Sequence, residues 1–282
     1  MRSCAALLLA APLLQACGGG QRPVAREDPI LRLHADAASS AIALDRTQEA
    51  IGQYRQAFDR AVARDDYAAI GDYGYNLAVA QLSVNQPKEA LASIRITRAE
   101  LALRGPPSFP ALDLAEATAD YRLGERKKSD SIAAEVEAGT DPASAADAAF
   151  VRGLIADGRA DAVGLDDAIA RLGQPTSSNQ QADLAELLAR RDLSQGMFAV
   201  AAAEAERAAD LRRDILDYRG MARALGVAAN AEARAGDREA AAALYARAAQ
   251  SAAASGDTES VRTSRRLEDE KTFGSTDTGL RE

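Results

Sequence analysis

The chain has 282 residues, of which 47% are hydrophobic but only 4% aromatic, and it contains no tryptophan. Its formal net charge is −8, which argues against nucleic acid as a partner, because such binding depends on a basic surface that displaces counterions from phosphates. Alanine and leucine supply most of the hydrophobic fraction, and both favour helices. The composition therefore predicts an all-α protein with an acidic, soluble surface.

The residue types that carry most enzyme chemistry are scarce in this chain. Cys4 and Cys17 are the only cysteines, and His34, which we expect to face solvent, is the only histidine. The region after Cys17 therefore has no disulfide or cysteine metal site, and histidine catalysis and multi-histidine zinc sites are excluded. Phosphate-binding glycine loops, serine nucleophile motifs and metal-binding helix motifs are also lacking. We expect no catalytic residue, no cofactor and no metal.

The N-terminus has the features of an export signal. Arg2 precedes an apolar run of eleven residues, 4–14, whereas a membrane-spanning helix needs roughly 20. A short positive segment followed by a short apolar run is typical of a secretory signal peptide.

The end of this run resembles a bacterial lipoprotein signal through Leu14, Ala16 and Cys17, although Gln15 is less usual there than a small residue. The resemblance implies that residues 1–16 are removed and that Cys17 carries lipid, with 17–30 as a flexible tether. Because Gly18 is not the aspartate that retains enterobacterial lipoproteins at the inner membrane, it also implies the periplasmic face of the outer membrane. The alternative is a plain secretory signal with an incidental cysteine.

From Ile30 onward, apolar residues recur at spacings of three and four, and no alternating β-branched run is present, so we predict helices and no strands. Small residues also recur at a longer interval. Successive members of this series are separated by 40, 39, 39, 33 and 40 residues, which indicates an array of repeated helical hairpins. The series is Ala50, Ala90, Ser129, Ala168, Ala201 and Ala241.

Two segments, 75–91 and 225–249, resemble the tetratricopeptide repeat (TPR). Tyr75, Asn76, Leu77 and Ala78 match a run that the first helix of this repeat often contains. Pro87 falls in the first turn of the second helix, where no amide proton is needed. The residues that should pack one helix on the next in this resemblance are Leu77, Ala78, Ala90, Gly196, Ala201, Gly236, Ala241, Tyr245 and Ala248.

The resemblance implies a right-handed superhelical solenoid of about six TPR-like hairpins over residues 31–256. A polar helix over 257–271 should cap the open end, and 272–282 should be a disordered tail. Prolines and glycines at 105–110, 141–142 and 173–175 separate the units. Residues 157–159 match the turn of the repeat poorly, so the second helix of the fourth unit should be short or shifted.

In this family the first helices line a concave groove that holds a peptide or a partner helix. By register, the residues that should point into the groove are Tyr75, Val79, Leu82, Tyr121, Arg122, Arg190, Asn230 and Arg234. Several of these side chains could equally pack between helices. Arginine and aromatic side chains often dominate binding energy.

The predicted function is a non-catalytic, lipid-anchored periplasmic scaffold that binds an envelope protein partner at the outer membrane. Envelope assembly, pilus or secretion machinery and cell-wall machinery all fit this layout. One alternative is a self-associating structural protein of the envelope. Another is an enzyme that uses carboxylates in the groove, but the acidic pairs 65–66 and 166–167 are better read as helix-start or solvated charges, because neighbours on a helix do not share a face.

Overall fold

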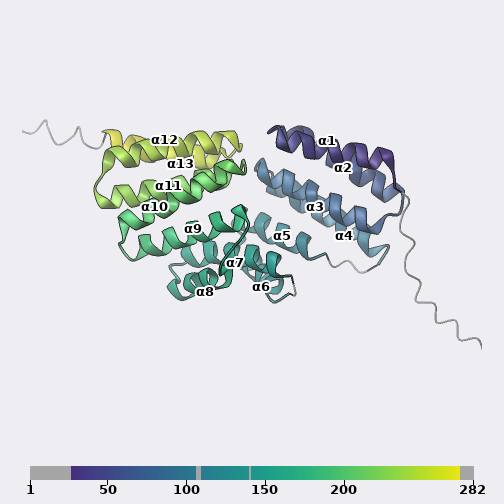
Figure 1. Cartoon of the computed structure of the whole chain (residues 1–282), viewed down its shortest axis with the longest axis horizontal. Coiled ribbons are helices and arrows are strands. Elements are labelled where there is room, and N and C mark those ends of the chain that lie inside the picture. Colours follow the sequence, from purple (N-terminus) through teal and green to yellow (C-terminus); the bar gives the residue numbers. More distant parts are fainter. Residues whose placement is uncertain (1–26, 106–108, 140, 274–282) are drawn as a thin grey trace, which may run out of the picture.

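The computed structural model describes residues 27–105, 109–139 and 141–273. Within these ranges the chain forms thirteen helices and no strand (Figure 1). The helices are α1 Pro29–Ala43, α2 Thr47–Ala63, α3 Tyr67–Ser83, α4 Pro87–Ala102, α5 Pro110–Arg122, α6 Arg126–Glu137, α7 Pro142–Asp157, α8 Ala162–Leu172, α9 Ser178–Ser194, α10 Phe198–Asp214, α11 Tyr218–Ala235, α12 Arg238–Ala254 and α13 Thr258–Phe273.

Helices α1 to α12 form six hairpins, and each helix packs mainly on its neighbours in the chain. The predicted series of small residues lies in the second helix of each hairpin. All six members are at most 3% exposed, and Ser129 satisfies its buried hydroxyl by donating to the carbonyl of Ala117 at 2.7 Å. Because each small side chain lets two helices approach closely, the period of the series becomes the period of the stack. The predicted solenoid of TPR-like hairpins is confirmed.

Short turns of one recurring design join the helices. In nine turns, the residue directly before the helix N-cap has a positive φ. Four of these residues are glycine and three are Asp or Asn, the types that adopt this conformation most easily. Several of the following aspartates, such as Asp66 and Asp237, then accept a hydrogen bond from an amide in the first turn of the helix.

The predicted boundaries differ from the structure at the first helix. Helix α1 begins at Pro29, whereas the flexible tether was expected to continue to residue 30. Asp28 explains the difference: its carboxylate caps α1 and forms ion pairs with Arg60 at 2.8 Å and Arg64 at 2.9 Å. Asp28 therefore belongs to the folded body.

At the other end, α13 begins at Thr258, one residue after the expected start of the capping helix, and continues to Phe273. The fourth hairpin has the short second helix that the poor turn predicted, because α8 has only 11 residues. The predicted signal, the lipid site at Cys17 and most of the predicted tail, residues 1–26 and 274–282, lie outside the described residues.

The stack curves until its two ends face each other (Figure 1). We call α1–α5 the N-terminal arm and α9–α13 the C-terminal arm; α6–α8 form the base that joins them. Among the described residues, two hydrogen bonds connect the arms. Tyr218 donates to Asp45 at 3.0 Å, and Arg219 donates to the side-chain oxygen of Asn85 at 2.6 Å. We call this pair the closing contacts.

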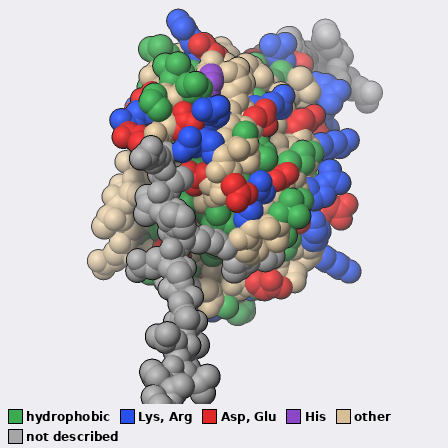
Figure 2. Space-filling model, turned by 90° about the vertical axis from the view of Figure 1, so that its right-hand side faces the viewer, with side chains coloured by type: hydrophobic (Ala, Val, Ile, Leu, Met, Phe, Trp, Pro, Cys, Tyr) green, Lys and Arg blue, Asp and Glu red, His purple; other side chains and the backbone are tan. Residues whose placement is uncertain are grey.

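The outer surface carries both signs of charge. On the face shown in Figure 2, Lys and Arg side chains are interspersed with Asp and Glu over most of the surface, and Lys and Arg predominate along the right-hand edge of the view. None of the helices in the described ranges combines the length and the apolarity that a membrane crossing needs.

Candidate functional site

A cavity of about 1300 Å³ lies between the two arms, and we call it the central cavity. Its walls come from both arms and from the base, and helices α4 and α8 contribute no lining residue. Most of the lining comes from the first helices of the hairpins, notably α3, α5, α7 and α11. This placement agrees with the expectation that first helices line the concave side of the solenoid.

Six of the eight residues predicted for the groove line the central cavity, namely Tyr75, Val79, Leu82, Tyr121, Arg122 and Asn230. Arg190 and Arg234 do not, and each has partners elsewhere. Arg190 binds Asp157 at 2.6 Å and Glu186 at 2.9 Å between helices of the base and the C-terminal arm. Arg234 lies over the ring of Phe198 and donates to the carbonyl of Leu193, at the outer end of its helix.

Seven of the nine residues predicted to pack the repeats are buried, whereas Gly196 and Gly236 are exposed in turns, where a Cβ atom would meet nothing within 4 Å. Leu77, Ala78 and Tyr245 are at most 6% exposed. Gly196 and Gly236 have φ angles of 80° and 96° at turns between the helices of a hairpin, a conformation in which glycine avoids the strain of a Cβ atom.

Aromatic side chains are concentrated on the cavity wall. Five of the chain's seven tyrosines line it: Tyr54, Tyr75, Tyr121, Tyr218 and Tyr245. Phe150 of α7 also lines the wall, with the guanidinium carbons of Arg212 and Arg223 at 5.6 and 5.3 Å from its ring centroid. The wall therefore combines the two residue classes that supply most binding energy at protein interfaces.

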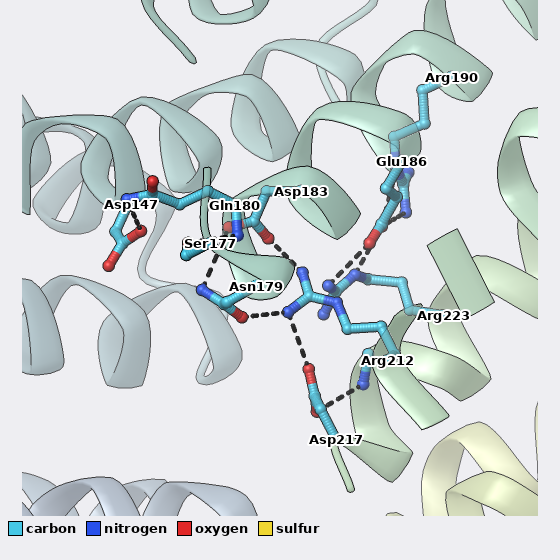
Figure 3. A network of polar contacts seen from close by, with 11 residues as sticks. Asp147, Ser177, Asn179, Gln180, Asp183, Glu186, Arg190, Arg212, Asp217 and Arg223 are labelled. Atoms are coloured by element: carbon cyan, nitrogen blue, oxygen red, sulfur yellow. Dashed lines mark hydrogen bonds and ion pairs between the residues drawn. The ribbon is translucent and has the colours of Figure 1, made fainter. Parts of the chain in front are cut away.

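A buried ionic network supports this wall (Figure 3). Glu186 of α9 is fully buried and accepts from Arg223 at 2.6 Å and Arg190 at 2.9 Å. Burial alone would raise the pKa of Glu186, but the charges of Arg223 and Arg190 lower it more strongly, to about 2. Glu186 is therefore ionised and holds two arginines in fixed positions.

A second part of the network centres on Arg212, which is 3% exposed. Arg212 contacts Asp183, donates to Asn179 at 2.6 Å and pairs with Asp217 at 3.1 Å (Figure 3). Burial raises the pKa of Asp183 to about 7, against the opposing charges of Arg212 and Arg223. Burial also raises the pKa of Asp147, whose carboxylate accepts from Gln180 at 3.0 Å.

Arg122, at the end of α5, differs from these arginines. Its guanidinium donates to the carbonyl oxygen of Leu82, and within the described part of the chain it contacts no carboxylate. Burial, together with the charges of Arg219 and Arg223, lowers the pKa of Arg122 to about 9. The charges of Asp217 and Asp257 oppose this shift, but among the described residues neither carboxylate forms an ion pair with Arg122.

Several cavity residues were not predicted from the sequence, and for some of them a signal was available. Arg219, Arg223 and Gly226 precede Asn230 on α11 at offsets of eleven, seven and four residues, so all four share one face of the helix. Helical register from Asn230 could therefore have predicted that these three residues line the groove as well. Phe150 and Arg212 carry no such signal, because their place on the wall depends on how the arms curve.

The adjacent acidic pairs have structural roles outside the cavity. Asp66 caps α3, and its neighbour Asp65 binds Arg104 at 2.6 Å. Asp167 pairs with Arg171 within α8 at 3.0 Å. Within the described ranges, no group of three or more His, Cys, Asp and Glu residues could hold a metal ion.

No protein-family model and no curated protein matches the chain. Among solved structures it is similar to a tetratricopeptide repeat protein from Parabacteroides merdae ATCC 43184, with a TM-score of 0.46 and 14% identity over 86% of this chain and 99% of that chain. It is also similar to the TPR2AB domain of yeast Sti1 in its complex with pHSP90, with a TM-score of 0.35 and 14% identity over 86% and 98%. The description of the fold rests on the hairpins themselves.

Proposed function

We propose that the chain is a scaffold that holds a segment of a protein partner in the central cavity. The observation that carries this proposal is the concentration of tyrosine and arginine on the cavity wall. The size of the cavity supports it, because about 1300 Å³ exceeds the roughly 300 to 1000 Å³ typical of small-molecule pockets. A peptide or a single helix of a partner is an occupant of the right scale.

The two arms give the partner a route into the cavity. The closing contacts lie at the ends of the arms, so loss of these two hydrogen bonds would loosen the mouth of the cavity without removing a side chain from the core of a hairpin. When the ends of the arms move apart, the buried ion pairs of Glu186 with Arg190 and Arg223 still hold α9 and α11 together at the wall. A partner segment could therefore enter between the ends of the arms and bind against a wall that does not move.

The cavity is tested by cross-linking in the native cell. A photo-reactive amino acid placed at Tyr121 in the cavity should cross-link a defined partner. The same group at Ile96, which is 55% exposed on α4 outside the cavity, should give no such product. Equal cross-linking from both positions would contradict the cavity as the binding site.

The proposal also includes the location of the protein in the cell. The sequence of residues 1–17 supports a lipid on Cys17 that holds the body at the periplasmic face of the outer membrane, where the partner would be an envelope protein. Replacement Cys17→Ser should release the body from the membrane fraction. Retention at the wild-type level would contradict lipid anchoring, and cross-linking from Tyr121 would still report on the cavity.

A carboxylate-based activity is the second candidate, because Asp147 and Asp183 both line the cavity and both have raised pKa values. We rank it lower, since Asp183 is 2% exposed and contacts Arg212, which leaves Asp147 as the accessible acid. Conversion of the bound partner by the wild type but not by Asp147→Asn would favour this activity. Unchanged partner after prolonged incubation would favour the scaffold.

A further inference from the structure

Arg122 indicates the chemistry of the occupant, because no carboxylate among the described residues forms an ion pair with it. Three other cavity arginines already contact carboxylates. These pairs are Arg212 with Asp183 and Asp217, Arg219 with Asp257, and Arg223 with Glu186. Arg126 also contacts no carboxylate within the described ranges, but its side chain is exposed and water can solvate it. Arg122 is half-buried and has only a backbone carbonyl as its acceptor.

The acids of the cavity compensate Arg122 only in part. Asp217 and Asp257 act on it by charge, but Asp217 pairs with Arg212, and most of the other acids also have partners of their own. Asp45 accepts from Tyr218, Asp147 accepts from Gln180, and Asp257 both pairs with Arg219 and caps α13. Asp214 and Glu259 are exposed to water. A carboxylate that enters the cavity would give Arg122 the charge-assisted hydrogen bonds that the folded chain does not supply.

The mouth of the cavity has an apolar lip, which we define as Ile42, Ile215 and Leu216. Their side chains are 38%, 39% and 44% exposed, and all three residues line the cavity. They flank the closing contact between Asp45 and Tyr218 in the sequence. The lip therefore offers apolar surface to whatever passes through the mouth.

Leu216 is one of two residues at the shared turn position that are not Gly, Asp or Asn; the other is the exposed Ala160, with a φ of 55°. Leu216 has a φ of 59°, a conformation that a leucine adopts only with strain. The corresponding residues of most other turns are Gly124, Gly196, Gly236, Gly256, Asp45, Asp65 and Asn85, which adopt it more easily. Folding gains little from a strained leucine whose side chain is half exposed, so contact with an occupant is a better reason for its presence.

We propose that the occupant is a segment of a protein partner that carries an Asp or Glu side chain flanked by apolar residues. Its carboxylate binds Arg122, and its apolar side chains lie on the tyrosines of the wall and on the lip. This inference rests on the proposed function, because it describes the partner of the same cavity. It assigns Arg122 and Leu216 as determinants of specificity.

The test uses the chain with Cys17→Ser and random twelve-residue peptides on phage as probes. Selected peptides should share an Asp or Glu between apolar residues. In fluorescence anisotropy, changing that Glu to Gln should weaken binding about 10- to 100-fold, the range for a hydrogen bond to a charged group. With Arg122→Gln protein, the same peptide change should have almost no effect, so the two changes form a double-mutant cycle.

Two matched variants serve as controls. Arg126→Gln removes an exposed arginine of the same cavity and should leave affinity within about twofold, as expected for a solvated charge. Leu216→Gly relieves the strained turn, so its melting temperature should stay equal or rise while peptide binding weakens. Unaltered binding of the acidic peptide by Arg122→Gln would overturn the assignment of Arg122, and unaltered binding by Leu216→Gly would overturn that of Leu216.

A further variant separates this inference from the proposed function. A Cβ atom added at Gly226 would meet nothing within 4 Å, and Gly226 lines the cavity, so the side chain of Gly226→Trp should extend into the cavity and occupy part of it. If Gly226→Trp abolishes binding but Arg122→Gln does not, the cavity binds peptides without reading a carboxylate, and only this inference fails. Peptides that bind Gly226→Trp normally would contradict both proposals. Light scattering that shows a dimer abolished by Gly226→Trp would instead identify the occupant as a second copy of the chain.

Discussion

The interfaces within each arm are closely packed, whereas the junction between the arms consists of a few polar contacts. Within the N-terminal arm, helices α3 and α4 approach so closely that a Cβ atom at Gly74 would overlap the side chain of Thr97. Between the arms, two hydrogen bonds connect turns that leave Ile215 and Leu216 about two-fifths exposed. The difference indicates that the hairpins supply the stability and that the junction is free to serve binding.

The largest effect is expected inside the C-terminal arm. Replacement Glu186→Gln leaves Arg190 and Arg223 buried without their shared counter-charge, which should cost roughly 3 to 5 kcal/mol of unfolding free energy. Urea denaturation measures the change. The control Glu204→Gln removes a surface pair with Arg207 and should cost less than about 1 kcal/mol. Similar losses in both variants would show that the network does not stabilise the arm.

The same carboxylate predicts a pH dependence. The folded-state pKa of Glu186 is about 2, below the ordinary value of 4.5, so the unfolded chain takes up the proton first as the pH falls. The stability from Glu186 is therefore complete above about pH 4.5 and is lost towards pH 2, an effect of about 3 kcal/mol. The difference between wild type and Glu186→Gln should shrink below pH 4.5. A constant difference between pH 6 and pH 3 would be inconsistent with this shift.

A smaller effect is expected from overpacking one repeat interface. Gly153→Ala places a methyl group against Leu187 and Ala168, which should cost about 1 to 3 kcal/mol. The matched control is Gly52→Ala, because a Cβ atom there meets nothing within 4 Å and α2 gains a better helix former. Thermal unfolding should shift downwards for Gly153→Ala and upwards for Gly52→Ala. Equal shifts would show that Gly153 is not at a tight interface.

The smallest effect is expected at the junction. The double replacement Asn85→Gly and Tyr218→Phe removes both closing contacts but no packed side chain, and glycine keeps the positive φ of residue 85 without strain, so the replacement should cost less than about 1 kcal/mol. Small-angle X-ray scattering should show a larger radius of gyration as the arms separate. A loss above about 2 kcal/mol, or an unchanged radius, would mean that the junction is an integral part of the fold.

The same contrast explains how much could be predicted from the sequence. Each hairpin is fixed by local signals, such as the buried small residue at Ala90 or Ala241 and the cap at Asp237. The lining of the cavity follows from helix register for residues such as Tyr75 and Arg122. Local patterns are therefore sufficient for the stack and for part of the candidate site.

The closure of the arms could not be predicted in this way. It results from the sum of small rotations between successive hairpins, and it brings Asp45 to Tyr218 across 173 residues. Arg190 shows a related limit, since register placed it in the groove, whereas Glu186 and Asp157 bind it between helices. A buried counter-ion is not visible in the helical register alone.

Amide hydrogen exchange, measured with and without a selected peptide, tests the central cavity most directly. Turns of one design occur at both ends of the hairpins, so each arm has an internal control. We predict that the turns at Asn85 and Leu216, beside the mouth, exchange at least about tenfold more slowly in the complex. The turns at Asp65 and Gly236 do not line the cavity and should be unchanged. Equal protection of both sets, or none at the mouth, would contradict binding in the central cavity.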